Sequence, residues 1–255
     1  MITSTSNEKV KHVTELVKNA RARRKEGLFV VEGVRIAGEI PQEALSECFV
    51  SEDLCAQGRV DEIFPYDVSV TPVSSAVFKK MSDTQNPQGI ICVCRQKELS
   101  EDDILADPKS DLKLLLLEGI QDPGNLGTMV RTAEGAGFDA VIADNNTVDV
   151  YNPKVTRSTM GSVFRVPVIY TYDLPGFVGK LQRSSVTVYA AHLRGSVDYR
   201  DVTYNDRLAF LIGNEGAGLS DGISALADKL VRIPMHGKLE SLNAAVAAAI
   251  LMFSV

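Results

Sequence analysis

Three segments of the chain place glycine, amide, hydroxyl and charged residues directly after apolar runs. The first is EGIQDPGNLGTMVRTAEGAG at 118–137, which follows the run LLLL. The second is LIGNEGAGLS at 211–220, and the third is IPMHGKLESLNAAVAAAI at 233–250. Open α/β sheets bind their ligands in the loops at the carboxyl ends of strands, so these segments predict the walls of one polar binding site.

The first segment enters a helix that carries two glycines close to its start. Gly124, Gly127 and Arg131 lie near one line of this helix if it begins by Gly124. Glycine costs about 1 kcal/mol relative to alanine inside a helix, so the pair indicates close approach of a ligand or of another backbone. Asn125 is a candidate functional amide, and it is also a residue type that commonly caps a helix.

The other two segments add an acid and the start of a second helix. Glu215 follows a buried run, where a solvated surface acid is the ordinary explanation. Ser241 and Asn243 precede an alanine-rich helix, where either could be the N-cap, and a helix N-terminus also presents free N–H groups to a polar ligand. GNEGAG lacks the GxGxxG spacing, and the chain has no GxxxxGK[ST], which disfavours a dehydrogenase or an NTPase.

Length and composition are those of an ordinary globular protein. The chain has 255 residues, of which 45% are hydrophobic, and this length accommodates one large domain or two medium ones. The N-terminus has no apolar signal region, and the longest apolar stretch, Ala244 to Phe253, is shorter than the roughly 20 residues that span a bilayer. We therefore expect a cytoplasmic protein without membrane contact.

The cysteine pattern does not favour a metal site. The four cysteines Cys48, Cys55, Cys92 and Cys94 form no CxxC pair, and the chain has three histidines. We therefore predict no metal and interpret the cysteines as buried reduced thiols.

One short segment is strongly basic although the whole chain has a net charge of −6. Residues 9–25 contain seven cationic side chains and the single acid Glu15. A solvated helix face would explain this composition, and so would a patch that contacts phosphates. The cations are Lys9, Lys11, Lys18, Arg21, Arg23, Arg24 and Lys25.

The hydrophobic pattern predicts two α/β domains. Upstream, helices over 11–24 and from 32 alternate with strands at 28–31, 48–50, 68–70 and 89–93. Downstream, strands at 114–117, 139–143, 166–170, 186–191, 208–212 and 229–235 alternate with helices at 125–136, 153–164, 174–183, after 218 and from 241. Continuous apolar runs indicate strands buried on both faces, hence a mostly parallel sheet. We place domains at 1–96 and 113–255, with a polar linker at 97–112.

In this order the three segments resemble the signature motifs of the SpoU/TrmH family of RNA ribose 2′-O-methyltransferases. NLGTMVR at 125–131 resembles the first motif, LIGNEGAGLS the second and IPMHGKLESLNAAVAAAI the third. GLFVVEGVRIAGEI and TQNPQGIICV are similar to the small RNA-binding domain that precedes the catalytic domain in many members. The resemblance implies a Rossmann-like, mostly parallel sheet with a deep trefoil knot, preceded by a small α/β domain.

The same resemblance implies a homodimer that binds S-adenosylmethionine in the knot, and it assigns roles to individual residues. The catalytic set is Asn125, Arg131, Glu215, Ser241 and Asn243. The cofactor-binding set is Ala191, His192, Leu193, Ile212, Gly213, Asn214, Gly216, Ile233, Met235, Ser241 and Leu242. The RNA-binding set is the seven cations of residues 9–25 together with Arg35.

Two questions about the reaction stay open at this point. A guanidinium does not readily give up its proton, so we expect Arg131 to stabilise negative charge on the 2′-oxygen rather than to act as a base. The preceding small domain favours ribosomal RNA over transfer RNA as the substrate. A tRNA methyltransferase and a non-catalytic RNA-binding protein of the same fold are the alternatives.

Overall fold

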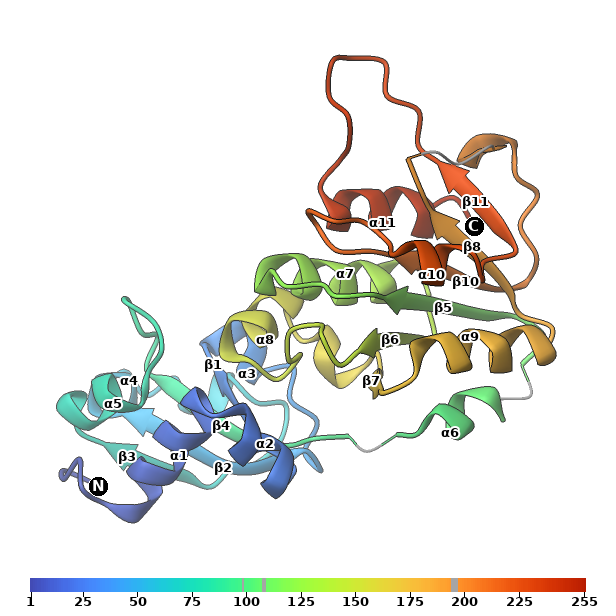
Figure 1. Cartoon of the computed structure of the whole chain (residues 1–255). Helices are drawn as coiled ribbons and strands as arrows, with labels where there is room; N and C mark the ends of the chain where they lie inside the picture. The colour runs from blue at the N-terminus through green and yellow to red at the C-terminus, as the bar shows by residue number, and fades with distance from the viewer. Residues whose placement is uncertain (98, 107–108, 194–196) are drawn as a thin grey trace. The chain divides into compact units, whose positions relative to one another are not determined.

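The computed structural model describes residues 1–97, 99–106, 109–193 and 197–255, and the chain divides into two compact units (Figure 1). Unit 1 comprises Met1–Glu98 and Asp149–Phe164, and unit 2 comprises Leu99–Val148 and Arg165–Val255. Within the described residues, every helix is too short or too polar to cross a membrane.

Unit 1 is built on a four-stranded sheet with the order β1-β4-β2-β3. Strand β4 is antiparallel to both β1 and β2, whereas β2 and β3 are parallel. The strands are β1 (Leu28–Glu32), β2 (Leu45–Ser51), β3 (Val70–Val73) and β4 (Ile90–Arg95). The helices are α1 (Glu8–Lys18), α2 (Ala20–Glu26), α3 (Val34–Ala37), α4 (Glu52–Ala56), η1 (Val60–Glu62), α5 (Ser75–Met81), α8 (Pro153–Thr159) and η2 (Ser162–Phe164).

One face of this sheet is covered by α1 and α5. Val10, Val13 and Leu16 of α1 are fully buried in a cluster with side chains from all four strands and from α5. The sequence predicted one helix over 11–24, but the structure has two. Asn19 ends α1 in an extended conformation, and its side chain accepts hydrogen bonds from the first N–H groups of α2. A residue type that favours caps therefore interrupts the predicted helix.

The segment 149–164 belongs to unit 1, although unit 2 contains the chain on either side of it. The Phe29 ring lies 4.6 Å from the Tyr151 ring and 5.7 Å from the Phe164 ring, centroid to centroid. Arg23 is 3% exposed, and its Nη2 donates to Asp149 Oδ2 at 2.6 Å. Aromatic burial and a buried ion pair therefore attach this segment to the N-terminal sheet.

Unit 2 contains a seven-stranded sheet with the order β7-β6-β5-β10-β8-β11-β9, in which every recorded pairing is parallel. Its strands are β5 (Leu112–Leu117), β6 (Ala140–Asp144), β7 (Val168–Thr171), β8 (Thr187–Ala191), β9 (Val197–Asp198), β10 (Arg207–Ile212) and β11 (Lys229–Arg232). Its helices are α6 (Glu101–Leu105), α7 (Pro123–Gly135), α9 (Leu174–Arg183), η3 (Tyr199–Asp201), α10 (Asp221–Ser224) and α11 (Ala244–Met252).

Helices cover both faces of the parallel sheet, as its continuous apolar strands require. Buried side chains of α6, α9 and α10 form one cluster with β5, β6, β8 and β10. Helices α7 and α11 pack on each other, with α7 also against β6 and α11 against β10 (Figure 1). The α/β class and the mostly parallel sheet predicted from the sequence are confirmed.

The predicted domain limits differ from the two units in two respects. Residues 99–106 and 109–112, within the predicted linker 97–112, belong to unit 2, because Ile104 of α6 is buried against the large sheet. Residues 98, 107 and 108 lie outside the described residues. The segment 149–164 belongs to unit 1, a grouping that no local pattern predicted.

Two predicted elements are shorter in the structure. The helix predicted over 153–164 ends at Thr159, because Met160 has a φ of 53° and Gly161 a φ of 97°. The last helix begins at Ala244 rather than at Ser241, and β11 ends at Arg232 rather than within IPM. The residues between β11 and α11 form a long loop (Figure 1).

The cysteines are free thiols. Cys48, Cys92 and Cys94 are buried in the small sheet as predicted, whereas Cys55 is half-buried. Burial raises the pKa of the Cys94 thiol well above its usual range, so this group stays protonated at neutral pH.

Candidate active site

The three signature segments meet at one edge of the large sheet. They follow β5, β10 and β11, and β10 is paired with β5 on one side and with β8 on the other. Strand β8 also pairs with β11, and the His192 N–H donates to the Val231 carbonyl at 2.9 Å. Because the strands are parallel, their carboxyl ends share one edge, as the sequence predicted.

The first segment forms the N-terminus of α7. Asp122 is the N-cap, and its Oδ1 accepts a hydrogen bond from the Asn125 N–H at 2.8 Å. Pro123 occupies the first turn, where a missing N–H costs nothing. Asn125 is therefore not the cap, and its amide side chain is available for other contacts.

Glu215 accepts four hydrogen bonds, three of which join the second segment to the first. Its Oε1 accepts from Asn125 Nδ2 at 2.9 Å and from the Asp122 N–H at 3.1 Å. Its Oε2 accepts from the Gln121 N–H at 3.2 Å and from Asn214 Nδ2 at 3.4 Å. Partial burial raises the pKa of the Glu215 carboxyl, but the hydrogen bonds from Asn125 and from backbone N–H groups outweigh it and lower the pKa overall.

Asn243 continues the same hydrogen-bond chain into the third segment. Its Nδ2 donates to Asn125 Oδ1 at 2.9 Å, and its Oδ1 accepts from the N–H groups of Ala245 and Val246. Asn243, not Ser241, is therefore the N-cap of α11. The ionised Glu215 carboxylate can only accept hydrogen bonds, and the backbone N–H groups at the start of α11 can only donate them. These partners therefore determine which end of the Asn125 and Asn243 amides is the oxygen and which is the nitrogen.

The second segment turns back on itself so closely that glycine is required at its start. A Cβ added at Gly213 would lie 2.2 Å from the Leu219 nitrogen and 2.3 Å from the Gly218 carbonyl carbon. Asn214 and Gly218 exchange two backbone hydrogen bonds of 3.1 and 2.9 Å. Gly213 therefore allows close approach of the loop's own backbone, which is one of the two explanations considered for the glycines of the first segment.

Asn214 holds this turn and attaches it to β5. Its Oδ1 accepts from the N–H groups of Gly216 and Ala217, and its Nδ2 donates to the Gly119 carbonyl at 2.7 Å. The side chain thus uses both ends of its amide in local structure. The predicted contact between Asn214 and the cofactor would therefore use the backbone of Asn214 rather than its side chain.

Two members of the predicted catalytic set lie apart from this network. Arg131 is exposed, and it forms no hydrogen bond or ion pair with a described residue. It follows Asn125 by six residues on α7, a rise of about 9 Å along the helix axis. Ser241 is likewise exposed in the loop before α11, without a hydrogen bond to any described residue.

The predicted cofactor-binding residues occupy four neighbouring stretches of unit 2. The stretch at the end of β8 contains Ala191, His192 and Leu193, and the stretch at the end of β10 contains Ile212, Gly213, Asn214 and Gly216. The stretch after β11 contains Ile233 and Met235, and the stretch before α11 contains Ser241 and Leu242. Residues 194–196, next to the first stretch, lie outside the described residues. The strand order brings the first three stretches to adjacent strand ends.

This residue set fits S-adenosylmethionine by its chemistry. The loops present backbone N–H and carbonyl groups, which suit an adenine edge and uncharged ribose hydroxyls. Leu193 is 66% exposed and Met235 is half-buried, so apolar side chains are available to pack against an adenine ring.

The predicted RNA-binding cations are mostly exposed, with one exception. Lys9 pairs with Glu47 at 2.6 Å and Lys11 with Glu8 at 2.7 Å, but both side chains remain more than half exposed. Lys18, Arg21, Arg24, Lys25 and Arg35 are also exposed. Arg23 is buried, and it donates to Asp149 and to the Leu16 and Val17 carbonyls. Its prediction as an RNA contact is therefore wrong, because local charge density does not reveal burial.

Sequence reasoning did not identify the acids that hold the strand ends together. Glu118 accepts hydrogen bonds from the N–H and the Oγ of Ser220, and Ser220 is the N-cap of α10. Asp144 accepts from Gly119 and Thr147 at the end of β6. Their position immediately after apolar runs was the available signal, and it is the same signal that identified Glu215.

The chain matches two family models in its two regions. The model of the SpoU rRNA Methylase family matches residues 113–253, and that of the MRM3-like substrate binding domain matches residues 7–92. The 23S rRNA (guanosine(2553)-2′-O)-methyltransferase RlmP of Bacillus subtilis is 35% identical over 254 residues. That alignment covers 99% of this chain and 97% of the relative.

Solved structures resemble the fold along its whole length. An rRNA methyltransferase from Sinorhizobium meliloti has a TM-score of 0.83 and 30% identity, with 99% of this chain and 95% of that chain covered. A structure described as the AdoMet-bound form of rRNA methyltransferase from that organism has a TM-score of 0.82 and 31% identity, with the same coverage. A TrmH-family RNA methyltransferase structure from Porphyromonas gingivalis has a TM-score of 0.81 and 28% identity, with 98% and 97% covered.

Proposed function

Because the chain belongs to the SpoU rRNA methylase family, we propose that it transfers a methyl group from S-adenosylmethionine to a ribose 2′-hydroxyl of ribosomal RNA. The observation that carries this proposal is the hydrogen-bond chain from Glu215 through Asn125 to Asn243. It joins all three signature segments, in a chain that matches a ribose methyltransferase over almost its full length.

The network acts by positioning. An ionised Glu215 orients the Asn125 amide, and Asn125 in turn holds Asn243 at the N-terminus of α11. These contacts tie the start of α7 to the start of α11 and hold the loop after β10 beside both. When bound there, S-adenosylmethionine supplies an electrophilic methyl group on its sulfonium. The backbone groups after Ile212 and Ile233 would hold it, and the apolar side chains of Leu193 and Met235 would be available to its adenine.

Arg131 is the residue we assign to the RNA. It is exposed and has no partner among the described residues, so its guanidinium is available to a phosphate or ribose oxygen. A guanidinium retains its proton, so its role is to stabilise negative charge that develops on the 2′-oxygen rather than to remove a proton. Ser241, exposed in the loop before α11, completes the proposed catalytic set.

Unit 1 carries the proposed RNA contacts. The exposed cations of residues 9–25 and Arg35 account for RNA binding by an acidic protein. The matched substrate-binding family model covers this region. Ribosomal RNA is favoured over transfer RNA because the full-length relative from Bacillus subtilis is named for a 23S rRNA guanosine.

Homodimerisation and the trefoil knot remain predictions from the resemblance, and a cytoplasmic location remains a prediction from the hydrophobic pattern of the sequence. The dimer is supported by apolar side chains that unit 2 exposes on α11 and before it. Val246 is 48%, Phe253 65% and Leu239 72% exposed. Val246 and Phe253 are seven residues apart and so fall on one face of the last helix, and exposed apolar residues that share a face are typical of a surface covered by a partner.

Mapping of ribose methylation tests the function directly. Ribosomal and transfer RNA from cells with and without the gene are compared nucleotide by nucleotide, and the purified full-length chain is then added back with S-adenosylmethionine. We expect one rRNA 2′-O-methyl group to disappear in the deletion and to be restored in vitro, with the equivalent of guanosine 2553 as the first position to inspect.

The other outcomes separate the alternatives. A lost site in tRNA identifies a tRNA methyltransferase instead. RNA binding without any lost site in either RNA class identifies a non-catalytic RNA-binding protein.

A further inference from the structure

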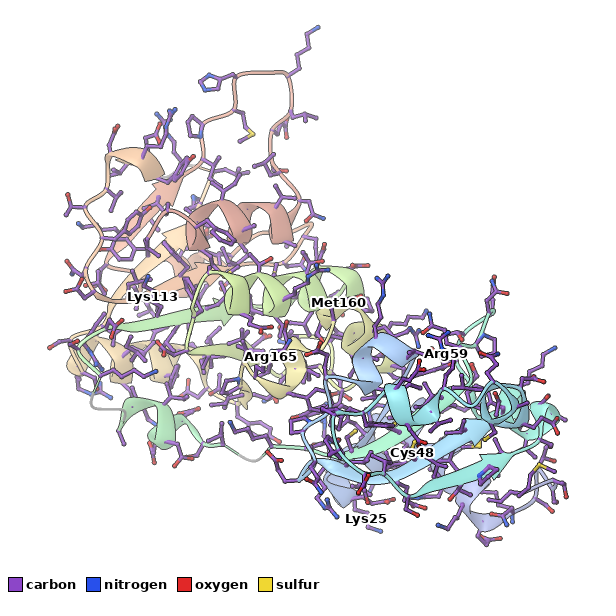
Figure 2. All side chains as sticks on the ribbon, turned by 180° about the vertical axis from the view of Figure 1, so that it is seen from behind. Lys25, Cys48, Arg59, Lys113, Met160 and Arg165 are labelled. Carbon is purple, nitrogen blue, oxygen red and sulfur yellow. The ribbon has the colours of Figure 1, made fainter. Side chains whose placement is uncertain are left out.

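Unit 1 contains a pocket that the methyl-transfer site does not use. Its volume is about 370 Å³, and its lining includes Glu32, Arg35, Asn86, Gln88, Arg157 and Met160. This volume lies within the range of roughly 300 to 1,000 Å³ that is typical of small-ligand pockets. The lining comes from the end of β1, helix α3, the loop before β4, and α8 with its C-cap residue, which the fold of unit 1 brings together. Figure 2 labels Met160 in this region.

Two arginines give the pocket the chemistry of a phosphate site. Arg35 is exposed and has no hydrogen bond or ion pair with a described residue. Arg157 Nη2 donates to Asp83 Oδ2 at 3.1 Å, whereas its Nη1 is buried and has no hydrogen-bond partner among the described residues. A buried donor without a partner is unfavourable, so a phosphate that draws the guanidinium toward it would satisfy this group.

The acidic groups near the pocket are already engaged. Glu32 is 7% exposed, and its carboxylate accepts from Ser82 Oγ at 2.6 Å, Thr84 Oγ1 at 2.7 Å and the Asp83 N–H at 3.1 Å. It therefore holds the loop 82–84 in place. Glu32 and Asp83 balance the charges of the two arginines, so a bare anion has little net attraction to the pocket, and a ligand must add other contacts.

Amide side chains and a thioether can supply those contacts. Gln88 Oε1 accepts from the Val34 N–H at 2.8 Å, which leaves its NH₂ group without a partner among the described residues. Asn86 is exposed, with both ends of its amide available. Amides pair with the donor and acceptor edges of nucleobases. Met160, at a φ of 53°, is 38% exposed and offers an apolar, polarisable surface to an aromatic ring.

We propose that this pocket accepts one unstacked nucleotide of the RNA substrate. Arg35, with Arg157, contacts the phosphate, Asn86 and Gln88 contact the base edge, and Met160 packs against the base. The proposal rests on the proposed function in so far as the ligand is RNA. It adds a single-nucleotide contact that lies outside the basic segment 9–25 and that draws on Arg157 and Met160 from the segment between β6 and β7.

Salt-dependent binding tests the phosphate contact. The probe is a fluorescein-labelled, random-sequence 12-nucleotide single-stranded RNA, and its binding to the full-length chain is followed by anisotropy. We expect Arg35→Ala to weaken binding about tenfold and to reduce the slope of log affinity against log salt by about 0.7, the value for one phosphate on a single strand. Lys79→Ala, which removes an exposed cation of α5 outside the pocket, is the matched control and should change affinity less than twofold.

Photo-crosslinking tests the base contact without any substitution. RNA that contains 4-thiouridine is irradiated with the full-length chain, and tryptic peptides are identified by mass spectrometry. We expect crosslinks in the peptide 81–95, which contains Asn86 and Gln88, and in 158–165, which contains Met160. A mixture of nucleoside monophosphates should suppress these crosslinks more strongly than inorganic phosphate at equal ionic strength.

The outcomes that overturn the proposal differ from those that overturn the proposed function. The nucleotide pocket is rejected if Arg35→Ala binds RNA as tightly as the wild type, if crosslinks are confined to residues 9–25, or if inorganic phosphate suppresses the crosslinks as well as the nucleotides do. Methyl transfer by the wild type would leave the proposed function intact in each of these cases. Pocket crosslinks and an Arg35 effect in a chain that methylates neither rRNA nor tRNA would remove the function and leave the pocket.

Discussion

The two units differ in how their sheets present side chains for function. In unit 2 every recorded strand pairing is parallel, so the loops after β5, β10 and β11 lie at one edge and meet in a single hydrogen-bond chain. In unit 1, β4 is antiparallel to both of its neighbours, so the carboxyl end of β4 lies at the opposite edge of the sheet from the carboxyl ends of β1 and β2. The pocket of unit 1 is assembled instead from the end of β1, helix α3, the loop before β4 and the distant segment 149–164.

The units also differ in charge. Unit 1 contains 15 lysines and arginines and 15 aspartates and glutamates, whereas unit 2 contains 12 and 18. The net charge of −6 therefore belongs to unit 2. A polyanion is repelled less by unit 1 than by unit 2, so the net charge of the whole chain does not exclude an RNA contact on unit 1.

The largest expected effect distinguishes catalysis in unit 2 from RNA binding by unit 1. Arg131→Ala removes the exposed guanidinium of α7, and we expect kcat for methyl transfer to fall by at least about 100-fold, as for other groups that stabilise developing charge. S-adenosylmethionine affinity, measured by calorimetry, should stay within a few-fold, and affinity for the 12-nucleotide RNA should change less than threefold. Loss of cofactor binding would show that Arg131 belongs to the cofactor site.

The second prediction concerns the buried ion pair of unit 1. Arg23→Ala leaves Asp149 without its main partner at 11% side-chain exposure, and we expect the free energy of unfolding to fall by about 3 to 5 kcal/mol. Arg24→Ala, an exposed neighbour in α2, is the control and should change stability by about 0.5 kcal/mol or less. Equal effects of the two substitutions in urea unfolding would contradict the structural role of Arg23.

The third prediction tests close backbone packing in unit 2. Gly213→Ala places a Cβ against the backbone of residues 218 and 219, and we expect a loss of about 1 to 3 kcal/mol in unfolding free energy, together with weaker S-adenosylmethionine binding. Gly222→Ala, in α10 and outside the predicted cofactor-binding set, is the matched control, because no atom of the described residues lies within 4 Å of its added Cβ. A stable Gly213→Ala chain with normal cofactor affinity would show that this turn is free to open.

The smallest expected effect is the pH dependence that Glu215 contributes. Burial raises the pKa of its carboxyl, but hydrogen bonds lower it further, so the folded chain binds this proton less readily than the unfolded chain. The stabilisation is therefore complete above the ordinary carboxyl pKa of about 4.3 and is lost as pH falls through the lower folded value. Because Glu215 is exposed, we expect less than about 1 kcal/mol.

Glu215→Gln tests this contribution in unfolding experiments between pH 7 and pH 3. The variant should be slightly less stable than wild type at pH 7, and the difference should shrink toward pH 3. Glu240→Gln, an exposed acid of the loop before α11, is the control. A difference that grows as pH falls would contradict the sign of the pKa change.

Much of unit 2 was predictable because its signals are local. Continuous apolar runs identified buried parallel strands, and the polar residues after them identified Asn125, Glu215 and Asn243 as members of one site. The resemblance to a methyltransferase family then specified the chemistry, which composition alone could not. The cap of α7 was missed because Asp122 and Asn125 are both good capping types, and only the backbone geometry selects between them.

The α/β class, the parallel sheet and the three loops were predictable from the amino-acid sequence, because strand periodicity and turn chemistry depend on neighbours along the chain. The burial of individual charges, the pairing of the amides and the packing of the segment 149–164 became visible in the folded chain alone. Arg23 and Asp149 are 126 residues apart, and Asn125 and Asn243 are 118 apart. Contacts over such separations depend on strand order and burial, which no local pattern encodes.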